Sequence, residues 1–122
     1  MGDWSKEPWG NDEAADWFGR YWNGGGIDLV IRDITDFSPA SELYDSIRAA
    51  CMVLECFGSA YAWPVERLEE REDVLRRAIE ILENMLSAPS AEWGFLDMWA
   101  NDLGVIDSVR KQIDKLEGYM RV

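Results

Sequence analysis

Carboxylates spaced three residues apart are the groups in this sequence with the clearest chemical potential. Side chains at i and i+3 share one face of a helix, so two such carboxylates can hold a divalent cation through their oxygens. Such pairs are Glu13 with Asp16, Glu69 with Glu72, and Glu80 with Glu83. The last two pairs lie in one predicted helical stretch with arginines between them, which is typical of a solvated face with salt bridges. A metal-dependent hydrolase using Glu13, Asp16 and carboxylates after Pro64 is therefore only an alternative interpretation.

Nucleophilic catalysis has little support, because the chain contains no histidine. This excludes Ser–His and Cys–His pairs and disfavours di-iron helical motifs, which normally include histidine. Cys51 and Cys56 are five residues apart on a predicted helix, so their side chains diverge and cannot form a disulfide. Arg48 is their one cationic neighbour and Glu55 opposes thiolate formation, so we expect buried structural thiols in a reducing compartment. The sequence assigns no catalytic residue, no metal ligand and no cofactor.

Net charge is the feature that bears most on partners. The 122 residues include 24 acidic and 12 basic side chains, which gives −12 and a pI near 4.3. Such a field repels nucleic-acid phosphates and anionic lipids and attracts a basic protein. The opening residues lack the apolar run of a secretory signal, and no stretch approaches the roughly 20 apolar residues of a membrane span. We expect a cytoplasmic bacterial protein that binds neither nucleic acid nor membrane.

The acidic residues least neutralised by nearby bases fall in two segments, residues 1–19 and 89–102. If the acidity serves a function, a partner is expected to bind there. The candidate partner-binding residues are Asp12, Glu13, Asp16, Glu92, Asp97 and Asp102.

The elements that position these residues are predicted to be helices. Apolar residues recur at helical spacing within residues 12–22, 27–34, 39–57, 64–88, 93–99 and 106–120, and no hairpin signal appears. Residues 64–88 fit either one helix or two with a break near Glu70. A hydrophobic content of 48% supports one core. The prediction is a single all-α domain over residues 1–122 with about five to six helices and an irregular, tryptophan-rich arm, residues 1–10, docked on it.

Capping residues define several helix boundaries. Asn11 is a good N-cap, and Asp12 follows where the helix dipole favours an anion. The glycines at 24–26 follow a helix and lack a preceding strand and a Lys-Ser/Thr, so they indicate a helix terminator and not a phosphate loop. Ser38 before Pro39 predicts a helix start, and Ser90 predicts the cap of a short helix.

Seven tryptophans are unusual in so short a chain. Helical spacing places Trp17, Trp22, Trp93 and Trp99 in the core. The candidates for partial exposure are those in irregular segments, Trp4, Trp9 and Trp63.

The amino-terminal residues resemble the start of a known bacterial family. The resemblance is carried by Met1, Gly2, Trp4, Pro8, Trp9, Asn11, Asp12, Ala14, Ala15, Asp16 and Trp17. The family is a domain of unknown function, numbered forty-two fifty-nine, and Ser90, Glu92, Leu96 and Trp99 are similar to its later segment. Ser5 and Glu7 depart from the pattern, because glycines are common there. The resemblance implies an all-helical domain of similar length and no established activity.

The motif predicts a structural role for Trp4, Trp9, Asn11, Asp16 and Trp17. Asn11 is expected to cap the first helix, and Trp17 to pack the arm onto it. Asp16 is expected to accept backbone amides of the arm between residues 4 and 9. Its alternative is a ligand role in a pocket.

These observations leave three functional hypotheses. The leading one is a non-catalytic acidic binding protein, of the immunity type, that neutralises a basic toxin. The second is the metal-dependent hydrolase described above. The third is a self-associating structural domain, in which the last helix and the tryptophans form a homodimer face.

Overall fold

The computed structural model describes residues 5–87, 90 and 92–120, and its architecture is all-α. No β-strand occurs among these residues, which form one compact domain, as the periodicity predicted. The α-helices are α1 (Asp12–Arg20), α2 (Gly26–Thr35), α3 (Tyr44–Phe57), α4 (Arg71–Met85), α5 (Phe95–Met98) and α6 (Leu103–Met120). Between them lie a π-helical turn, η1 (Tyr21–Gly25), and two 3-10 segments, η2 (Pro39–Ser41) and η3 (Val65–Glu70).

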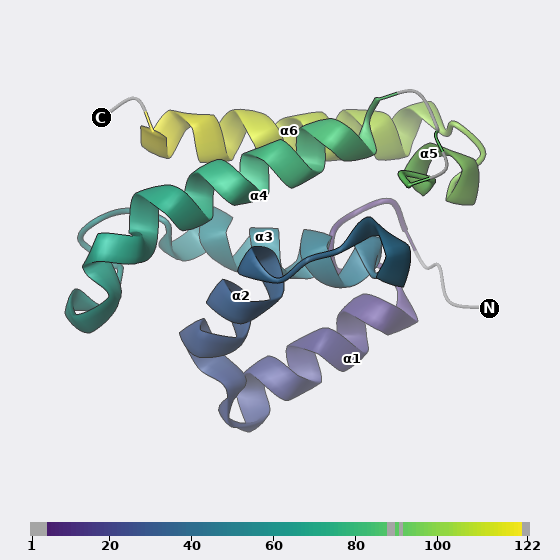
Figure 1. The fold of residues 1–122 in the computed structure, drawn as a ribbon. Helices are drawn as coiled ribbons and strands as arrows, with labels where there is room; N and C mark the ends of the chain where they lie inside the picture. Colours follow the sequence, from purple (N-terminus) through teal and green to yellow (C-terminus); the bar gives the residue numbers. More distant parts are fainter. Residues whose placement is uncertain (1–4, 88–89, 91, 121–122) are drawn as a thin grey trace.

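Helix α3 is the centre of the domain. Ten of its fourteen residues are buried, which requires neighbours around most of the helix. It packs against α1, α2, α4 and α6. Figure 1 shows α4 and α6 side by side on one side of α3, with α1 and α2 on the other. The polar groups of α3 must therefore be satisfied by these neighbours.

The first two helices form as the sequence predicts. Asn11 is the N-cap of α1, and its side-chain oxygen accepts a hydrogen bond from the Ala14 backbone N–H (2.8 Å). The chain turns at the glycines, where Gly24 has φ 110° and Gly26 has φ 53°. Side chains rarely adopt such positive φ values, so glycine is required for the reversal from α1 into α2.

The predicted helix over residues 39–57 begins later than expected. Ser38 does act as a cap, because its hydroxyl oxygen accepts from Ala40 N–H, but it caps only the 3-10 turn η2. Glu42 then adopts a left-handed conformation (φ 57°), which interrupts the helix before α3 starts at Tyr44. Leu43, which lies within the predicted helix over residues 39–57 but before α3, is consequently half exposed.

Of the two alternatives for the stretch after Pro64, the structure has two elements, η3 and α4, with the break after Glu70. The salt bridges predicted for this face form in α4, where Arg76 pairs with Glu72 (2.7 Å) and Asp73 (3.0 Å) and Arg77 pairs with Glu80.

The short helix after Ser90 is smaller than predicted. The Ser90 hydroxyl accepts from the backbone N–H of Trp93 (3.0 Å), but the α-helix begins only at Phe95. Asn101 adopts a positive φ, which turns the chain before α6 begins. Its buried face, which includes Val109, Ile113 and Leu116, matches the predicted apolar stripe.

Several predicted burial states are wrong. Trp22, expected in the core, is 79% exposed, and Trp63, expected to be partly exposed, is buried with its indole N–H donating to Arg67 O (2.8 Å). Trp9 is partly exposed as expected, and Trp4 lies outside the described residues. Cys51 is buried, but Cys56 is exposed.

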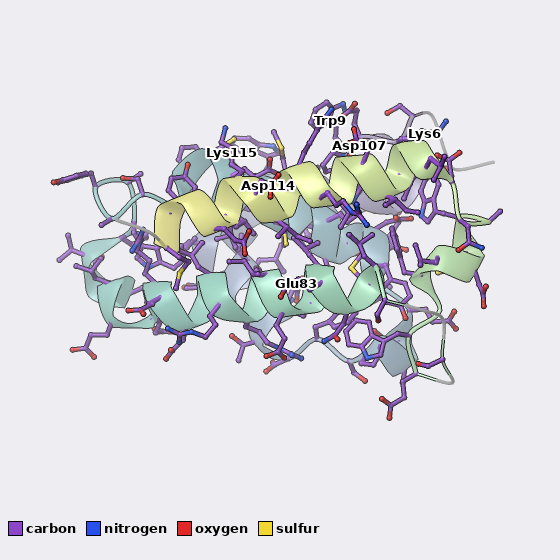
Figure 2. The ribbon with its side chains drawn as sticks, turned by 90° about the horizontal axis from the view of Figure 1, so that it is seen from above. Lys6, Trp9, Glu83, Asp107, Asp114 and Lys115 are labelled. Atoms are coloured by element: carbon purple, nitrogen blue, oxygen red, sulfur yellow. The ribbon has the colours of Figure 1, made fainter. Side chains whose placement is uncertain are left out.

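Residues 5–10 of the arm form hydrogen bonds with one another and contact α3 and the start of α6. Ser5 N–H donates to Gly10 O (3.0 Å), and Gly10 N–H donates to Glu7 O (3.0 Å). Lys6 forms an ion pair with Asp102 (3.4 Å), just before α6. Figure 2 shows Lys6 near the start of α6, and Trp9 on the side of α6 away from α4.

Arg48 of α3 is the polar centre of this contact. Its side chain is only 1% exposed. Its guanidinium donates to Gln112 Oε1 (3.0 Å), Ser108 Oγ (2.6 Å) and the Lys6 carbonyl (3.1 Å). Gln112 in turn donates to Glu55 Oε2 (2.9 Å). A single buried charge therefore joins α3, α6 and the arm.

Within the described part of the chain, no helix has the length and apolar character needed to cross a lipid bilayer.

The Arg48→Ala variant is expected to lose about 3 kcal/mol of unfolding free energy, because it leaves the buried partners of the guanidinium unsatisfied and opens a cavity. Urea unfolding monitored by circular dichroism measures this loss. Arg110→Ala, which removes an exposed arginine of α6, is the control and should change stability by less than about 0.5 kcal/mol. Equal losses in the two variants would contradict the role given to Arg48.

The Glu55→Gln variant tests how far the partly buried Glu55 carboxylate lowers the stability of the fold. Burial raises the pKa of Glu55, and the hydrogen bond from Gln112 with the charges of Lys115 and Arg48 only partly opposes this. The folded state then binds a proton more tightly than the unfolded state, whose pKa is about 4.3, so this group lowers stability as pH rises through that window. The variant should be more stable than wild type at pH 7.

Urea unfolding at a series of pH values checks this expectation. The gain should shrink as pH falls toward the unfolded pKa of about 4.3, where wild-type Glu55 is also neutral. Glu83→Gln, at an exposed position of α4, is the matched control and should show no such pH-dependent gain. A wild type more stable than Glu55→Gln at pH 7 would contradict the expectation.

Candidate functional site

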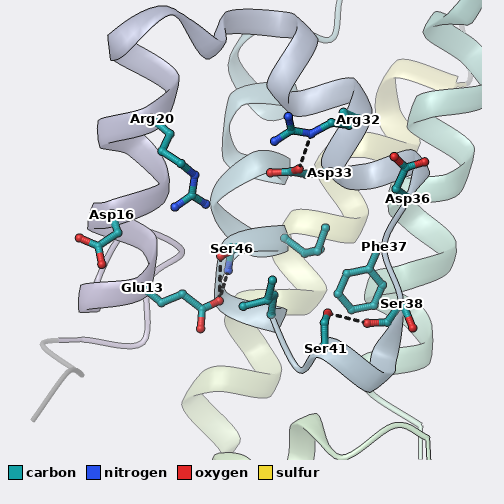
Figure 3. Close-up of a pocket in the computed structure, with 12 residues that line it drawn as sticks. Glu13, Asp16, Arg20, Arg32, Asp33, Asp36, Phe37, Ser38, Ser41 and Ser46 are labelled. Atoms are coloured by element: carbon teal, nitrogen blue, oxygen red, sulfur yellow. Dashed lines mark hydrogen bonds and ion pairs between the residues drawn. The ribbon is translucent and has the colours of Figure 1, made fainter.

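A cleft lies between α1, α2 and the start of α3. Its volume is about 610 Å³, and it contains Glu13 and Asp16, two of the six predicted partner-binding residues. Figure 3 shows it as a charged opening above a partly apolar floor. The lining residues are Glu13, Asp16, Arg20, Arg32, Asp33, Asp36, Phe37, Ser38, Ser41, Leu43, Ser46 and Ile47.

Glu13 stabilises the amino-terminal end of α3 from across the cleft. Its Oε2 accepts hydrogen bonds from the Ser46 backbone N–H (2.7 Å) and from the Ser46 hydroxyl (2.9 Å). The residue preceding α3, Leu43, provides no side-chain cap. Glu13 therefore supplies from another helix the anionic acceptor that the first turn of α3 lacks.

Asp33 has a comparable structural role between α1 and α2. Its Oδ2 accepts from the indole N–H of Trp17 (2.9 Å), and its Oδ1 accepts from Arg32 Nε (3.2 Å). Trp17 is fully buried and stacks on Tyr21. Trp17 thus attaches α1 to α2, whereas the sequence predicted that it would fasten the arm.

Asp16, Asp36 and Arg20 are the charged groups of the cleft that remain available. All three are exposed, and no hydrogen bond or ion pair engages their side chains within the described part of the chain. In Figure 3 the Arg20 side chain extends into the cleft, while the Asp16 carboxylate is turned outward. The Ser5 and Glu7 N–H groups, two of the arm amides expected to bind Asp16, donate instead to Gly10 O and to Ser5 Oγ.

The remaining predicted acids divide into free and structural ones. Asp12, Glu92 and Asp97 are exposed and form no ion pair among the described residues. Asp102 instead accepts from Val105 N–H (3.0 Å) and pairs with Lys6 (3.4 Å), so it caps α6 and holds the arm. The Val105 hydrogen bond is the main reason that the pKa of Asp102 is lowered.

Aromatic packing places the Glu92 segment next to the cleft. Phe37, which lines the cleft, packs on Tyr44 and Trp93, with ring centroids 5.9 and 5.8 Å away. The Tyr44 hydroxyl accepts from Gly94 N–H (3.1 Å) and donates to the Glu92 carbonyl (3.4 Å). The acids of α1 and those of residues 92–97 therefore flank the same amino-terminal end of α3.

A metal-dependent hydrolase would need several carboxylates that converge on one cation. No group of three or more carboxylate or cysteine side chains that could hold a metal ion occurs among the described residues. Glu72 and Glu80 of α4 are engaged by Arg76 and Arg77. The arrangement instead suits recognition of charged groups, since it offers both carboxylates and a guanidinium.

Sequence reasoning missed the contribution of α2 to the cleft. Arg32, Asp33 and Asp36 approach α1 only because the chain reverses at the glycines of η1. The amphipathic pattern of residues 27–34 indicated which face of α2 is buried, but no spacing in the sequence indicates which helix the polar edge meets.

Comparison of the chain with protein-family models, with curated proteins and with solved structures finds no match. The resemblance to the bacterial family described above therefore stays an expectation from sequence.

Two neighbouring carboxylates of α1 test the assignment of roles in the cleft. Glu13→Ala should lose about 1 to 2 kcal/mol of unfolding free energy, because the first turn of α3 loses its acceptor. Asp16→Ala, three residues along the same helix, should change stability by less than about 0.5 kcal/mol. Thermal and urea unfolding of both variants measure the difference. Equal stability of the two variants would contradict a capping role for Glu13.

Proposed function

We propose that this chain is a non-catalytic acidic binding protein that recognises a basic protein, and that it acts in the bacterial cytoplasm as an immunity-type protein neutralising a basic toxin. The net charge of −12 supports long-range attraction of such a partner. The cleft supplies carboxylates for contact at short range.

The observation that carries the proposal is a set of exposed acidic side chains that form no ion pair or hydrogen bond among the described residues. Asp12, Asp16, Glu92 and Asp97 are exposed, and no ion pair in the described residues neutralises them. Most of the chain's arginines are engaged elsewhere, as with buried Arg48. The negative field around the start of α3 is thus left for a partner.

The location of these acids also fits a role in binding rather than in stability. Glu13 and Asp102 accept hydrogen bonds at the starts of helices, so their carboxylates contribute to the stability of the fold. The other four acids of the predicted set form no hydrogen bond or ion pair among the described residues, although Asp12 lies in the first turn of α1, where the helix dipole favours an anion. Carboxylates placed in this way resemble the phosphates of a nucleic acid, which is the target that a toxic nuclease would recognise.

A charge-neutralising variant tests the proposal. The variant combines Asp12→Asn, Asp16→Asn, Glu92→Gln and Asp97→Asn, which changes the net charge from −12 to −8. Wild type should capture a basic protein from a lysate of the source bacterium, and the complex should weaken steeply as ionic strength rises from about 0.05 to 0.5 M. The variant should bind that protein at least about tenfold more weakly.

A matched control separates local recognition from total charge. Glu66→Gln, Glu69→Gln, Glu83→Gln and Asp114→Asn also give −8, but they remove exposed acids outside the cleft and outside residues 92–97. This control should retain wild-type affinity. When the captured protein is expressed in cells, wild type and control should suppress its toxicity and the first variant should not. A captured partner that is acidic, or binding indifferent to salt, would overturn the proposal.

A further inference from the structure

A groove runs along the exposed side of α3, apart from the charged cleft. It consists of three hollows of about 210, 260 and 230 Å³. The first two share Tyr21, Val53 and Phe57, and the second and third share Trp9 and Met52, so the hollows adjoin one another along α3. The floor is α3, with α1 and η1 on one side and the arm and α6 on the other.

The middle of this groove is an exposed aromatic surface. Trp22 is 79% exposed, Phe57 50% and Trp9 47%, although all three are large and apolar. They lie around the exposed Cys56 thiol in a hollow whose other lining side chains are also apolar or aromatic. Clustered exposed tryptophan and phenylalanine are typical of binding surfaces, because they anchor a partner once water is excluded.

The charge at one end of the groove indicates the sign of its partner. The third hollow contains Glu7, Glu55 and Lys111. Lys111 is already paired with Asp107 (3.0 Å), so the two carboxylates dominate that end. A positively charged segment is therefore complementary to the groove end as well as to the chain as a whole.

A second copy of this chain is a poorer occupant. Each copy carries −12, so bringing two copies together places like charges beside one another around the apolar surface. A basic partner gains from the same field. An amphipathic helix has the right form, because its side chains at i, i+3, i+4 and i+7 can fill successive hollows of an elongated groove.

We infer that the groove along α3 is the docking site for an amphipathic helix of a basic protein, with Trp22, Phe57 and Trp9 contacting its apolar face and Glu7 and Glu55 its cationic residues. This inference rests on the proposed function, from which it takes the basic partner. It adds a second contact surface, which acts through apolar burial and not through charge alone.

A peptide probe with a thiol readout tests the groove directly. The probe is a synthetic helix of about 18 residues, composed of leucine and lysine with the leucines on one face, and a permuted peptide of equal composition is the control. Iodoacetamide alkylates the exposed Cys56, and buried Cys51 is the internal reference. At about 0.5 M salt, where surface charge is screened, the amphipathic peptide should slow Cys56 alkylation at least about tenfold and the permuted one should not.

Variants of the groove give a second readout. Trp22→Ala and Phe57→Ala should each weaken peptide binding by about tenfold, while Trp22→Phe should recover most of the affinity. Leu103→Ala is the matched control, because it removes an apolar side chain that is 81% exposed but lies outside the groove. Urea midpoints equal to wild type should confirm that the variants fold, as expected for residues half or more exposed.

The outcomes separate this inference from the proposed function. Unchanged Cys56 alkylation, or peptide binding unaffected by Trp22→Ala and Phe57→Ala, overturns the groove as a docking site. Sedimentation that finds a wild-type dimer, converted to monomer by Trp22→Ala, makes a second copy the occupant and also overturns the inference. If the groove variants capture the basic partner as wild type does while the acidic variant loses it, the proposed function stands and the groove inference fails. Retained capture by the acidic variant overturns the proposed function instead.

Discussion

Ten of the fourteen residues of α3 are buried, so its buried polar groups need partners on other elements, and the organisation of this domain follows from that constraint. Arg48, in the middle of α3, donates to Gln112, Ser108 and the Lys6 carbonyl, so one guanidinium links α3 to α6 and to the arm. At the amino-terminal end the acceptor comes from Glu13 of α1. A buried charge and a buried helix terminus thus determine which elements surround α3.

The same constraint divides the acidic residues into two groups. Glu13 and Asp102 satisfy backbone N–H groups at the starts of α3 and α6, as a carboxylate near a positive helix end can do. Asp12, Asp16, Glu92 and Asp97 have no such task. Because net charge does little to specify a fold, an acidic excess of this second kind is best explained by solubility or by an electrostatic partner.

The two surfaces proposed for binding would contribute to different steps of association. Unneutralised carboxylates near the cleft act over several ångströms and raise the rate of encounter with a basic protein. The exposed aromatics of the groove act only on contact, where burying Trp22 and Phe57 would slow dissociation. A small domain with a single core can carry both, since they use different residues, the cleft at the amino-terminal end of α3 and the groove toward its carboxyl-terminal end.

The sequence by itself determined the helical class, the Asn11 cap, the reversal at Gly24–Gly26 and the buried stripe of the last helix, because caps, positive-φ glycines and periodicity act over a few neighbouring residues. Only the tertiary structure decided that Glu42 interrupts the helix before Tyr44, that Trp63 is buried while Trp22 is exposed, and that Glu13 pairs with Ser46. The candidate site was predicted in part, since Glu13 and Asp16 line the cleft but Asp33 and Asp36 complete it from another helix. Local pattern specifies which face of a helix is apolar, whereas the identity of the element covering that face depends on contacts between residues far apart in the chain.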